Sequence, residues 1–257
     1  MPFSAYSNIS SATTGTPGGG TPVAGAVIQL ESDEDVYSSF DFLTPANDGD
    51  GIEYWQDQQE GGGNPISTGW TVNGSPLPIY ESGAGDLING HPYVSKSASQ
   101  RHFQALVSDN VPGGFSFYLL FDREAGSGEE IVLDMNNTGG DGNLQLLLNS
   151  NGNVGYRSDG IVEEVAATVA GLQVLAWIFD EVAEEVRVYR DGVLIGTGTE
   201  FFSGGYTLGN GTLPFLADGN GNNDCDGKFL DFWAFKTSHS EPDRIQQTQY
   251  LMSRGGI

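Results

Sequence analysis

From about Gly25 onward, short apolar runs alternate with clusters of glycine, proline, asparagine, aspartate and serine. Short apolar runs bounded by turn-forming residues are typical of β-strands. The pattern predicts strands at 26–30, 36–43, 91–95, 101–107, 115–121, 130–135, 144–149, 154–158, 172–180, 185–191, 193–196 and 229–235. So many short strands at regular spacing favour an antiparallel β-sandwich.

Three of the intervening turns predict hairpins. Asn151-Gly152 and Asp191-Gly192 each separate two predicted strands, and both dipeptides accept the left-handed backbone of a tight hairpin turn. The acidic stretch at 179–186 should link two more strands, with its glutamates in solvent. We therefore expect antiparallel pairing of the strands on either side of each turn.

The last predicted strand, FLDFWAF at 229–235, carries apolar residues at both odd and even positions. Strict alternation places Phe229, Asp231 and Trp233 on one face, and Leu230 and Phe232 on the other. A strand with two apolar faces is expected to be central and covered on both sides.

Only the C-terminal region has helical features. Ser240, Pro242 and Asp243 provide an N-cap, a first-turn proline and a capping-box carboxylate, and Gly255-Gly256 provides a stop. This pattern predicts one helix of about three turns. The residues expected on its buried face are Ile245, Thr248 and Met252.

Residues 1–24 are rich in glycine, proline and threonine and have no hydrophobic period. They predict a flexible or extended arm, followed by one domain at 25–257. The arm is either disordered or lies along a partner protein, in which case Phe3, Tyr6 and Ile9 are its apolar anchors.

The formal net charge is −24, from 34 acidic and 10 basic residues. The basic residues are scattered, so neither nucleic acid nor an anionic membrane is an expected partner. A single cysteine, Cys225, cannot form an internal disulfide, and the first twenty residues lack the features of a signal peptide. These features indicate a chain that folds in a cytosol.

Several segments, taken in order, resemble the concanavalin A-like, laminin-G-type jelly-roll family of bacterial and phage proteins. IEYWQDQQEGGGN at 52–64 resembles its early Trp-x-Asp segment, and 87–106 resembles its Asn-Gly-x-Pro strand. The likeness continues through FSFYLLF at 115–121 and VYRDGVLIG at 188–196. Residues 226–257 resemble the closing strand, the Ser-x-x-Asp/Glu-Arg turn and the terminal helix of the family.

This resemblance covers 52–257, most of the chain. It implies an all-β fold: a two-sheet antiparallel jelly-roll sandwich, here with one short C-terminal helix and an extended N-terminal arm. The strand pattern predicts the same architecture independently.

No catalytic motif is present, so we expect a protein that is not an enzyme. Related glucanases carry a Glu-x-Asp-x-Glu run; here the nearest candidates are Glu130 and Asp134, which would share a strand face. The chain has three histidines, for which structural roles are expected. Acidic neighbours should raise the pKa of Cys225, which does not suit a nucleophile.

No cofactor is clearly implied, although one loop has oxygen ligands at alternate positions. Within DGNGNNDCD, the residues Asp218, Asp224 and Asp226 are the candidate calcium ligands. The alternative is ordinary turn chemistry, because asparagine, glycine and aspartate dominate turns with or without a cation.

Trp55 and Trp70 occur in polar sequence contexts. They are therefore the candidate exposed aromatics for stacking on a carbohydrate. Anchoring the hydrophobic core is the alternative for each.

Two functions follow from these features. The first is a structural protein of a phage virion, a capsid decoration or head-fibre protein assembled in the host cytoplasm. Its arm would bind other virion proteins such as the major capsid protein, and it would self-associate as a dimer or trimer. The alternative is a carbohydrate-binding module of a tail fibre or cell-surface protein, with glycans as ligands.

Overall fold

The structure is a computed structural model. It describes residues 20–39, 43–59, 70–72, 75–97, 102–107, 110–111, 114–123, 129–135, 144–148, 153–158, 161–167, 170–199, 206–207, 211–216 and 225–257.

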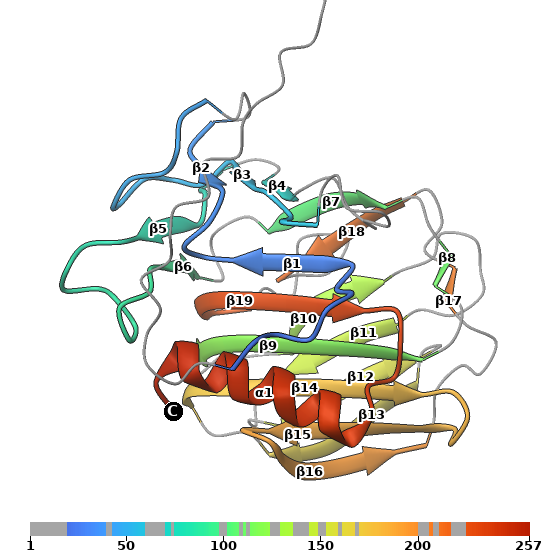
Figure 1. Ribbon diagram of the computed structural model, residues 1–257. Helices are drawn as coiled ribbons and strands as arrows, with labels where there is room; N and C mark the ends of the chain where they lie inside the picture. Colours follow the sequence, from blue (N-terminus) through green and yellow to red (C-terminus); the bar gives the residue numbers. More distant parts are fainter. Residues whose placement is uncertain are drawn as a thin grey trace, which may run out of the picture.

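The first of two large sheets has eight strands (Figure 1). Its order is β16 (Val193–Gly198), β15 (Glu185–Arg190), β14 (Gly171–Asp180), β9 (Phe115–Arg123), β19 (Gly227–Phe235), β6 (Tyr93–Lys96) and β5 (Ile79–Glu81), and β1 (Ile28–Glu31) also pairs with β19. The pairings are antiparallel throughout.

The second large sheet has nine antiparallel strands. Its order is β13 (Ile161–Ala167), β12 (Asn153–Ser158), β11 (Leu144–Leu148), β10 (Glu130–Met135), β18 (Gly211–Phe215), β7 (Phe103–Val107), β4 (Trp70–Val72), β3 (Tyr54–Trp55) and β2 (Val36–Tyr37). A separate short ribbon pairs β8 (Asn110–Val111) with β17 (Tyr206–Thr207).

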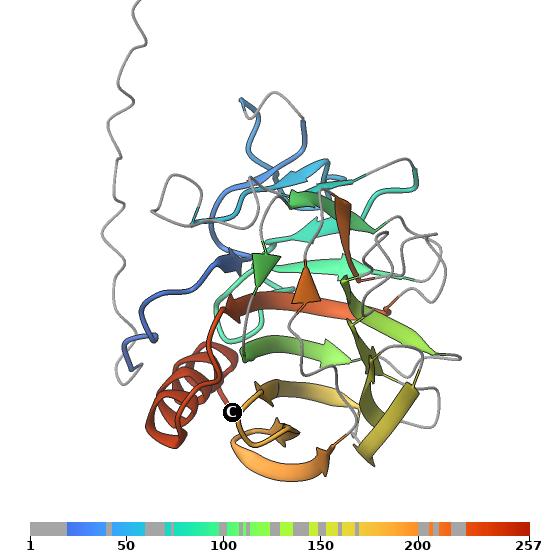
Figure 2. The ribbon, with the colours of Figure 1, turned by 90° about the vertical axis from the view of Figure 1, so that its right-hand side faces the viewer.

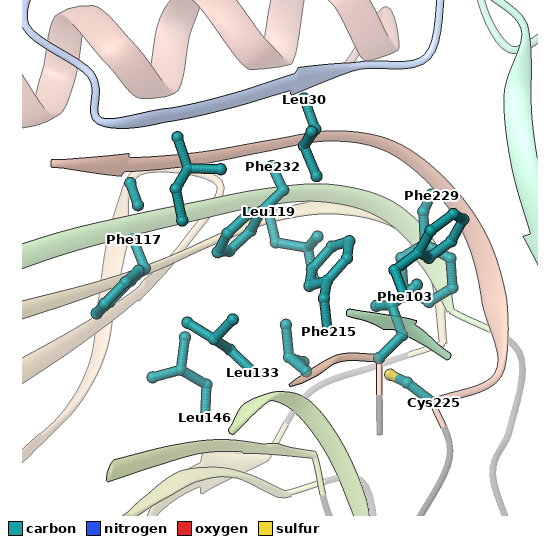
Figure 3. Close-up of a cluster of buried hydrophobic side chains, with 14 of the residues drawn as sticks. Leu30, Phe103, Phe117, Leu119, Leu133, Leu146, Phe215, Cys225, Phe229 and Phe232 are labelled. Atoms are coloured by element: carbon teal, nitrogen blue, oxygen red, sulfur yellow. The ribbon is translucent and has the colours of Figure 1, made fainter. Parts of the chain in front are cut away.

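The sheets pack face to face, and helix α1 (Glu241–Gly255) covers the outer face of the eight-stranded sheet (Figures 1 and 2). Aromatic and branched side chains from both sheets meet in the core between them (Figure 3). Phe215 of one sheet and Phe232 of the other have ring centroids 4.7 Å apart. The predicted all-β sandwich with one C-terminal helix is confirmed. Within the described residues, no helix is both long and apolar enough to cross a membrane.

Most predicted strands are present, and the exceptions have identifiable causes. Among the described residues of the predicted strand at 36–43, only Val36 and Tyr37 form a strand, and the Ser38 amide donates to the carbonyl of Thr44. The sequence pattern missed β3, β4 and β5 because they have only two or three residues. It missed β18 because Pro214 lies inside it, and proline is unusual within a sheet.

The predicted hairpins also form. Asp191 and Gly192 have φ values of 49° and 81° between β15 and β16, as a type I′ turn requires. The acidic turn joins β14 to β15, and Glu184 adopts a φ of 53° there. Strands β11 and β12 pair as expected, although Asn151-Gly152 lies outside the described residues.

Strand β19 is central and buried on both faces, as predicted, but its faces differ from strict alternation. A bulge interrupts its pairing with β9 between Phe229 and Asp231. Phe229 and Phe232 therefore both face the inter-sheet core, while Leu230 and Trp233 face α1. The assignment of Phe229 and Trp233 to one face was wrong, because a bulge adds one residue to the period of two.

Helix α1 begins and ends as predicted. The Ser240 side chain accepts a hydrogen bond from the Asp243 amide, and Gly256 ends the helix in the left-handed conformation. Its 15 residues make about four turns. The expected buried face was wrong in part, because Ile245 is 38% exposed. The residues that are buried are Arg244, Gln247, Thr248, Leu251 and Gly255.

The described end of the predicted arm lies against α1. The Val23 amide donates to Gln247 Oε1 at 3.0 Å, and Gln246 Nε2 donates to the carbonyl of Thr21 at 3.0 Å. Val23 also packs against the apolar cluster between α1 and the sheet. The proposed anchors Phe3, Tyr6 and Ile9 lie outside the described residues.

A partly buried ionic cluster joins the last turn of α1 to the sheet. Arg254 donates to Asp231 on β19 at 2.7 and 2.9 Å and to Asp33, after β1, at 2.6 Å. Although burial opposes it, hydrogen bonding from His91 and Arg254 lowers the pKa of Asp33. Burial and the nearby Asp231 raise the pKa of Glu31 to about 7. The cluster therefore links α1, β19 and the end of β1, because Arg254 provides the countercharge for carboxylates on both strands.

Candidate functional site

The nine-stranded sheet turns one face to the core and the other away from it. Val36, Trp55, Phe103, Phe215 and Leu146 face the core. Since neighbouring residues of a strand point to opposite sides, the residues between these positions face outward. The nine-stranded sheet and α1 lie on opposite sides of the molecule (Figure 2).

At one end of this outward face, four polar or aromatic side chains lie directly opposite one another. Tyr37 pairs with Tyr54, Tyr54 with Thr71, and Thr71 with Gln104. Gln104 in turn pairs with Pro214 on β18. Opposed residues of antiparallel strands have Cβ atoms about 5 Å apart, so the side chains of Tyr37, Tyr54, Thr71 and Gln104 are neighbours along the row.

The same line continues at the other end of the sheet. Asp134 pairs with Gln145, Gln145 with Arg157, and Arg157 with Val162. The pairing of Leu133 with Phe215 places Asp134 beside Pro214 and so joins the two halves. We call this line the polar row: Tyr37, Tyr54, Thr71, Gln104, Pro214, Asp134, Gln145, Arg157 and Val162.

The aromatic end of the polar row combines ring faces with amide and hydroxyl groups. The rings of Tyr37 and Tyr54 have centroids 6.1 Å apart and are tilted by 47°. Tyr54 is buried, whereas Tyr37, Thr71 and Gln104 are half-buried. Thr71 Oγ1 donates to the carbonyl of Gln104 at 3.2 Å, and Gln104 Nε2 lies 2.6 Å from His102 Nε2. These contacts fix the side chains before any ligand binds.

The arginine end of the polar row is held by charge. Arg157 Nη2 donates to both carboxylate oxygens of Glu129, at 2.8 and 2.9 Å. Arg157 Nη1 donates to Gln145 Oε1. Asp134 and Gln145 are buried, whereas Arg157, Glu129 and the apolar Val162 reach solvent.

Such a surface suits ligands that are rich in hydroxyl groups. A half-buried aromatic ring offers a flat apolar face, and amide, hydroxyl and guanidinium groups around it can exchange hydrogen bonds. Small-molecule sites commonly combine apolar contact with a few placed polar groups in this way. The sequence pattern missed this site because its residues come from nine strands.

The two tryptophans proposed as exposed stacking residues are both 0% exposed. Trp55 on β3 packs against Phe103, and its Nε1 donates to the carbonyl of Glu31 at 3.1 Å. Trp70 on β4 packs against Phe215. The expectation of exposed rings was wrong and the alternative of core anchors is confirmed, because both residues occupy core-facing positions of very short strands.

The proposed calcium site is described only in part. Asp218 and Asp224 lie outside the described residues, so their role as ligands stays a prediction. Asp226 directly precedes β19, is half-buried, and lies near Glu130 and Cys225. Its charge contributes to the raised pKa of both neighbours.

The structure brings together three other carboxylates that the sequence pattern did not connect. Oxygens of Asp48, Glu81 and Asp86 lie within 4.8 Å of one another. Asp48 Oδ1 accepts hydrogen bonds from the amides of Ser82 and Gly83, at 2.8 and 2.6 Å. Burial and the two neighbouring carboxylates raise the pKa of Glu81. Carboxylate oxygens of this kind are what a hard cation such as calcium takes as ligands.

Glu130 and Asp134 do not share a strand face. A bulge in β10 between Ile131 and Leu133 leaves Glu130 opposite the core-facing Leu148, and Asp134 opposite the outward-facing Gln145. Glu130 instead forms an ion pair with Arg123 across the two sheets, at 3.2 Å. Burial raises the pKa of Glu130 to about 7, although Arg123 opposes the change. The expectation of a shared face was wrong because the bulge changes the period.

Cys225 and two of the histidines occupy positions at which they stabilise the fold. Cys225 is fully buried, and burial together with Glu130 raises its pKa, as predicted. His91 contacts Asp33, and His239 Nδ1 lies 2.7 Å from the hydroxyl of Tyr118. Burial lowers the pKa of His239 to about 4.

No family model and no curated protein matches the chain. Among solved structures, the chain is similar to domain 4 of AbnA, a GH43 extracellular arabinanase from Geobacillus stearothermophilus, in complex with arabinotriose. The TM-score is 0.60 at 14% identity, over 87% of this chain and 98% of that one.

Two further similar structures are botulinum neurotoxin binding domains. For serotype G the TM-score is 0.54 at 12% identity, over 87% of this chain and 50% of that one. For the binding domain of neurotoxin DC in complex with SialylT it is 0.53 at 10% identity, over 89% and 52%. This chain therefore spans about half of the toxin structures. At such identities the likeness establishes the fold, a jelly-roll-like β-sandwich.

Proposed function

We propose that this protein is a non-catalytic carbohydrate-binding β-sandwich whose ligand lies along the polar row. The observation that carries the proposal is the register of the nine-stranded sheet. It places Tyr37 and Tyr54 beside Thr71 and Gln104 on the face turned away from the core. Tyr37 would stack on the sugar ring, and Gln104 and Thr71 would bond its hydroxyl groups.

The similar structures support this proposal at the level of the fold. Domain 4 of the arabinanase is described in complex with arabinotriose, and one toxin binding domain in complex with SialylT. A fold that is found in complex with such ligands in other proteins is a suitable scaffold for the same task here. Membership of the laminin-G-type family, which the sequence motifs suggest, forms part of the proposal.

The test is glycan binding by the full chain and by variants of the aromatic end. Tyr37→Ala and Gln104→Ala should each weaken binding by roughly tenfold, since one aromatic or hydrogen-bonding contact contributes about 1–1.5 kcal/mol. Tyr80→Ala, a half-buried tyrosine on β5, and Gln246→Ala on α1 are matched controls that should bind normally. Binding that survives both row substitutions would place the ligand elsewhere and refute the site.

The virion role predicted from the sequence gains no support from the comparisons and stays a prediction. One observation sharpens its test: Thr21 and Val23 contact α1, so deletion of residues 1–24 would also remove part of the packing. Deletion of 1–19 keeps those contacts and removes the proposed anchors. A virion role through the arm predicts a folded protein that no longer joins its assembly, and unchanged incorporation would contradict it.

A further inference from the structure

The nine-stranded sheet contains very few basic side chains. Among the residues of its nine described strands, Arg157 is the single lysine or arginine. The same strands contain four acidic residues, namely Glu130, Asp134, Glu163 and Glu164. An anionic ligand on the polar row would therefore depend on one guanidinium group.

That guanidinium is already paired. Glu129 accepts two hydrogen bonds from Arg157 Nη2, and Gln145 accepts one from Nη1. Charge-assisted hydrogen bonds of this kind are stronger than neutral ones, and this carboxylate belongs to the same chain. The two side chains are 25% and 30% exposed, so a ligand can reach them, and Glu129 competes with that ligand for the arginine.

The other described basic residues lie away from this face. They belong to the eight-stranded sheet, to the residue that follows β19, or to α1: Lys96, Arg123, Arg187, Arg190, Lys228, Lys236, Arg244 and Arg254. Arg101, directly before β7, lies outside the described residues. With a net charge of −24 on the chain, the field at the polar row favours cations over anions.

Building on the proposed function, we infer that the polar row selects neutral glycans over glycans that carry carboxylate or sulfate groups, and that Glu129 sets this selection. Glu129 neutralises Arg157, the one lysine or arginine among the described strand residues of this sheet. What remains for the ligand are amide, hydroxyl and aromatic groups, which bind uncharged hydroxyls well. An acidic sugar at the arginine end of the polar row would bring an unpaired negative charge next to Glu129.

The inference predicts a specificity switch. Replacing Glu129 with glutamine removes the negative charge that occupies Arg157 and retains the size of the side chain. The freed guanidinium should then bind a sugar carboxylate, with a gain in affinity of roughly tenfold or more. The gain should fall as salt is raised, since it is electrostatic at a partly exposed site. Affinity for neutral glycans should change little.

The experiment compares the full wild-type chain with Glu129→Gln and with the Glu129→Gln/Arg157→Gln double variant. Binding is measured on a glycan array. The array carries arabinotriose, lactose and sialyllactose, together with neutral oligosaccharides and their sulfated and uronic acid counterparts. Wild type should bind a neutral member more tightly than its acidic counterpart. Glu129→Gln should gain acidic binding, and the double variant should lose that gain.

Three results would overturn the inference, and they are distinguishable. Preference of the wild type for acidic glycans would refute neutral selection while leaving the proposed function intact. Loss of that preference in Arg101→Gln would then identify Arg101 as the missed cation. Absence of any acidic gain in Glu129→Gln would refute the role of Glu129. If the wild type binds no glycan at all, the proposed function and the inference fail together.

Discussion

Replacement of Arg254 by methionine should strongly destabilise the protein. Arg254 lies in the last turn of α1, its side chain is 11% exposed, and that of its partner Asp231 is 0% exposed. The substitution keeps much of the side-chain volume and removes the one cation that contacts both Asp231 and Asp33. Buried carboxylates would then lack a countercharge, which is costly in a medium of low polarity.

The expected loss follows from this burial. Removing one partner of a buried ion pair costs about 3–5 kcal/mol, whereas an exposed pair contributes about 0–1 kcal/mol. Arg187→Met is the matched control, because Arg187 also contacts two carboxylates but is 28% exposed. For a chain of this size, the Arg254 variant should melt roughly 6–20 °C lower, and the control only a few degrees lower.

The measurement is urea unfolding at pH 5 and pH 8, with tryptophan fluorescence as the signal. The loss should be smaller at pH 5, because carboxyl groups without Arg254 take up protons more readily. Adding Asp231→Asn to the Arg254 variant should recover part of the stability, as a double-mutant cycle would show. A loss below about 1 kcal/mol at pH 8, or one equal to the Arg187 control, would refute the claim that this cluster is a tightly coupled unit.

Three further predictions concern other parts of the sandwich. The pKa of Glu130 is raised from 4.5 to about 7 in the folded protein, so its contribution to stability is complete below about pH 4.5 and is lost as pH rises to about 7. This loss should be on the order of 3 kcal/mol in pH-dependent unfolding and absent from Glu130→Gln. Calcium should raise the melting temperature of the wild type more than that of a variant with Asp224 and Asp226 replaced by alanine, and equal shifts would end the calcium prediction for that loop. Gly196→Ala should lower the free energy of unfolding by about 1–3 kcal/mol, because the new Cβ would lie 2.7 Å from the carbonyl carbon of Val165 in the backbone of β13. Gly85→Ala is the control: its Cβ would meet no neighbouring atom, so stability should not change.

Local patterns predicted those elements whose determinants are local. The helix could be placed because Ser240 and Gly256 act through adjacent backbone groups. The hairpin at Asp191-Gly192 could be placed because only a few residue types accept its backbone angles. Long strands such as β9 and β14 were visible because most of their residues are apolar.

Features that depend on pairing between distant segments were not predictable in this way. The bulges in β10 and β19 move Glu130 and Phe229 to the inter-sheet side, and nothing in their own sequence marks the extra residue. Trp55 and Trp70 looked exposed because their neighbours are polar, yet their short strands turn both rings into the core. The side a residue faces is set by the partner strand, which local sequence does not specify.

The sequence by itself determined that this chain forms an antiparallel sandwich with a capped C-terminal helix and a strongly acidic surface. It did so because hydrophobic period, turn chemistry and net charge are properties of neighbouring residues or of the whole composition. Only the tertiary structure decided which side chains share the outward face of the nine-stranded sheet. Tyr37, Gln104 and Arg157 lie on one face because the register of nine strands aligns them, and register results from packing across the whole sheet.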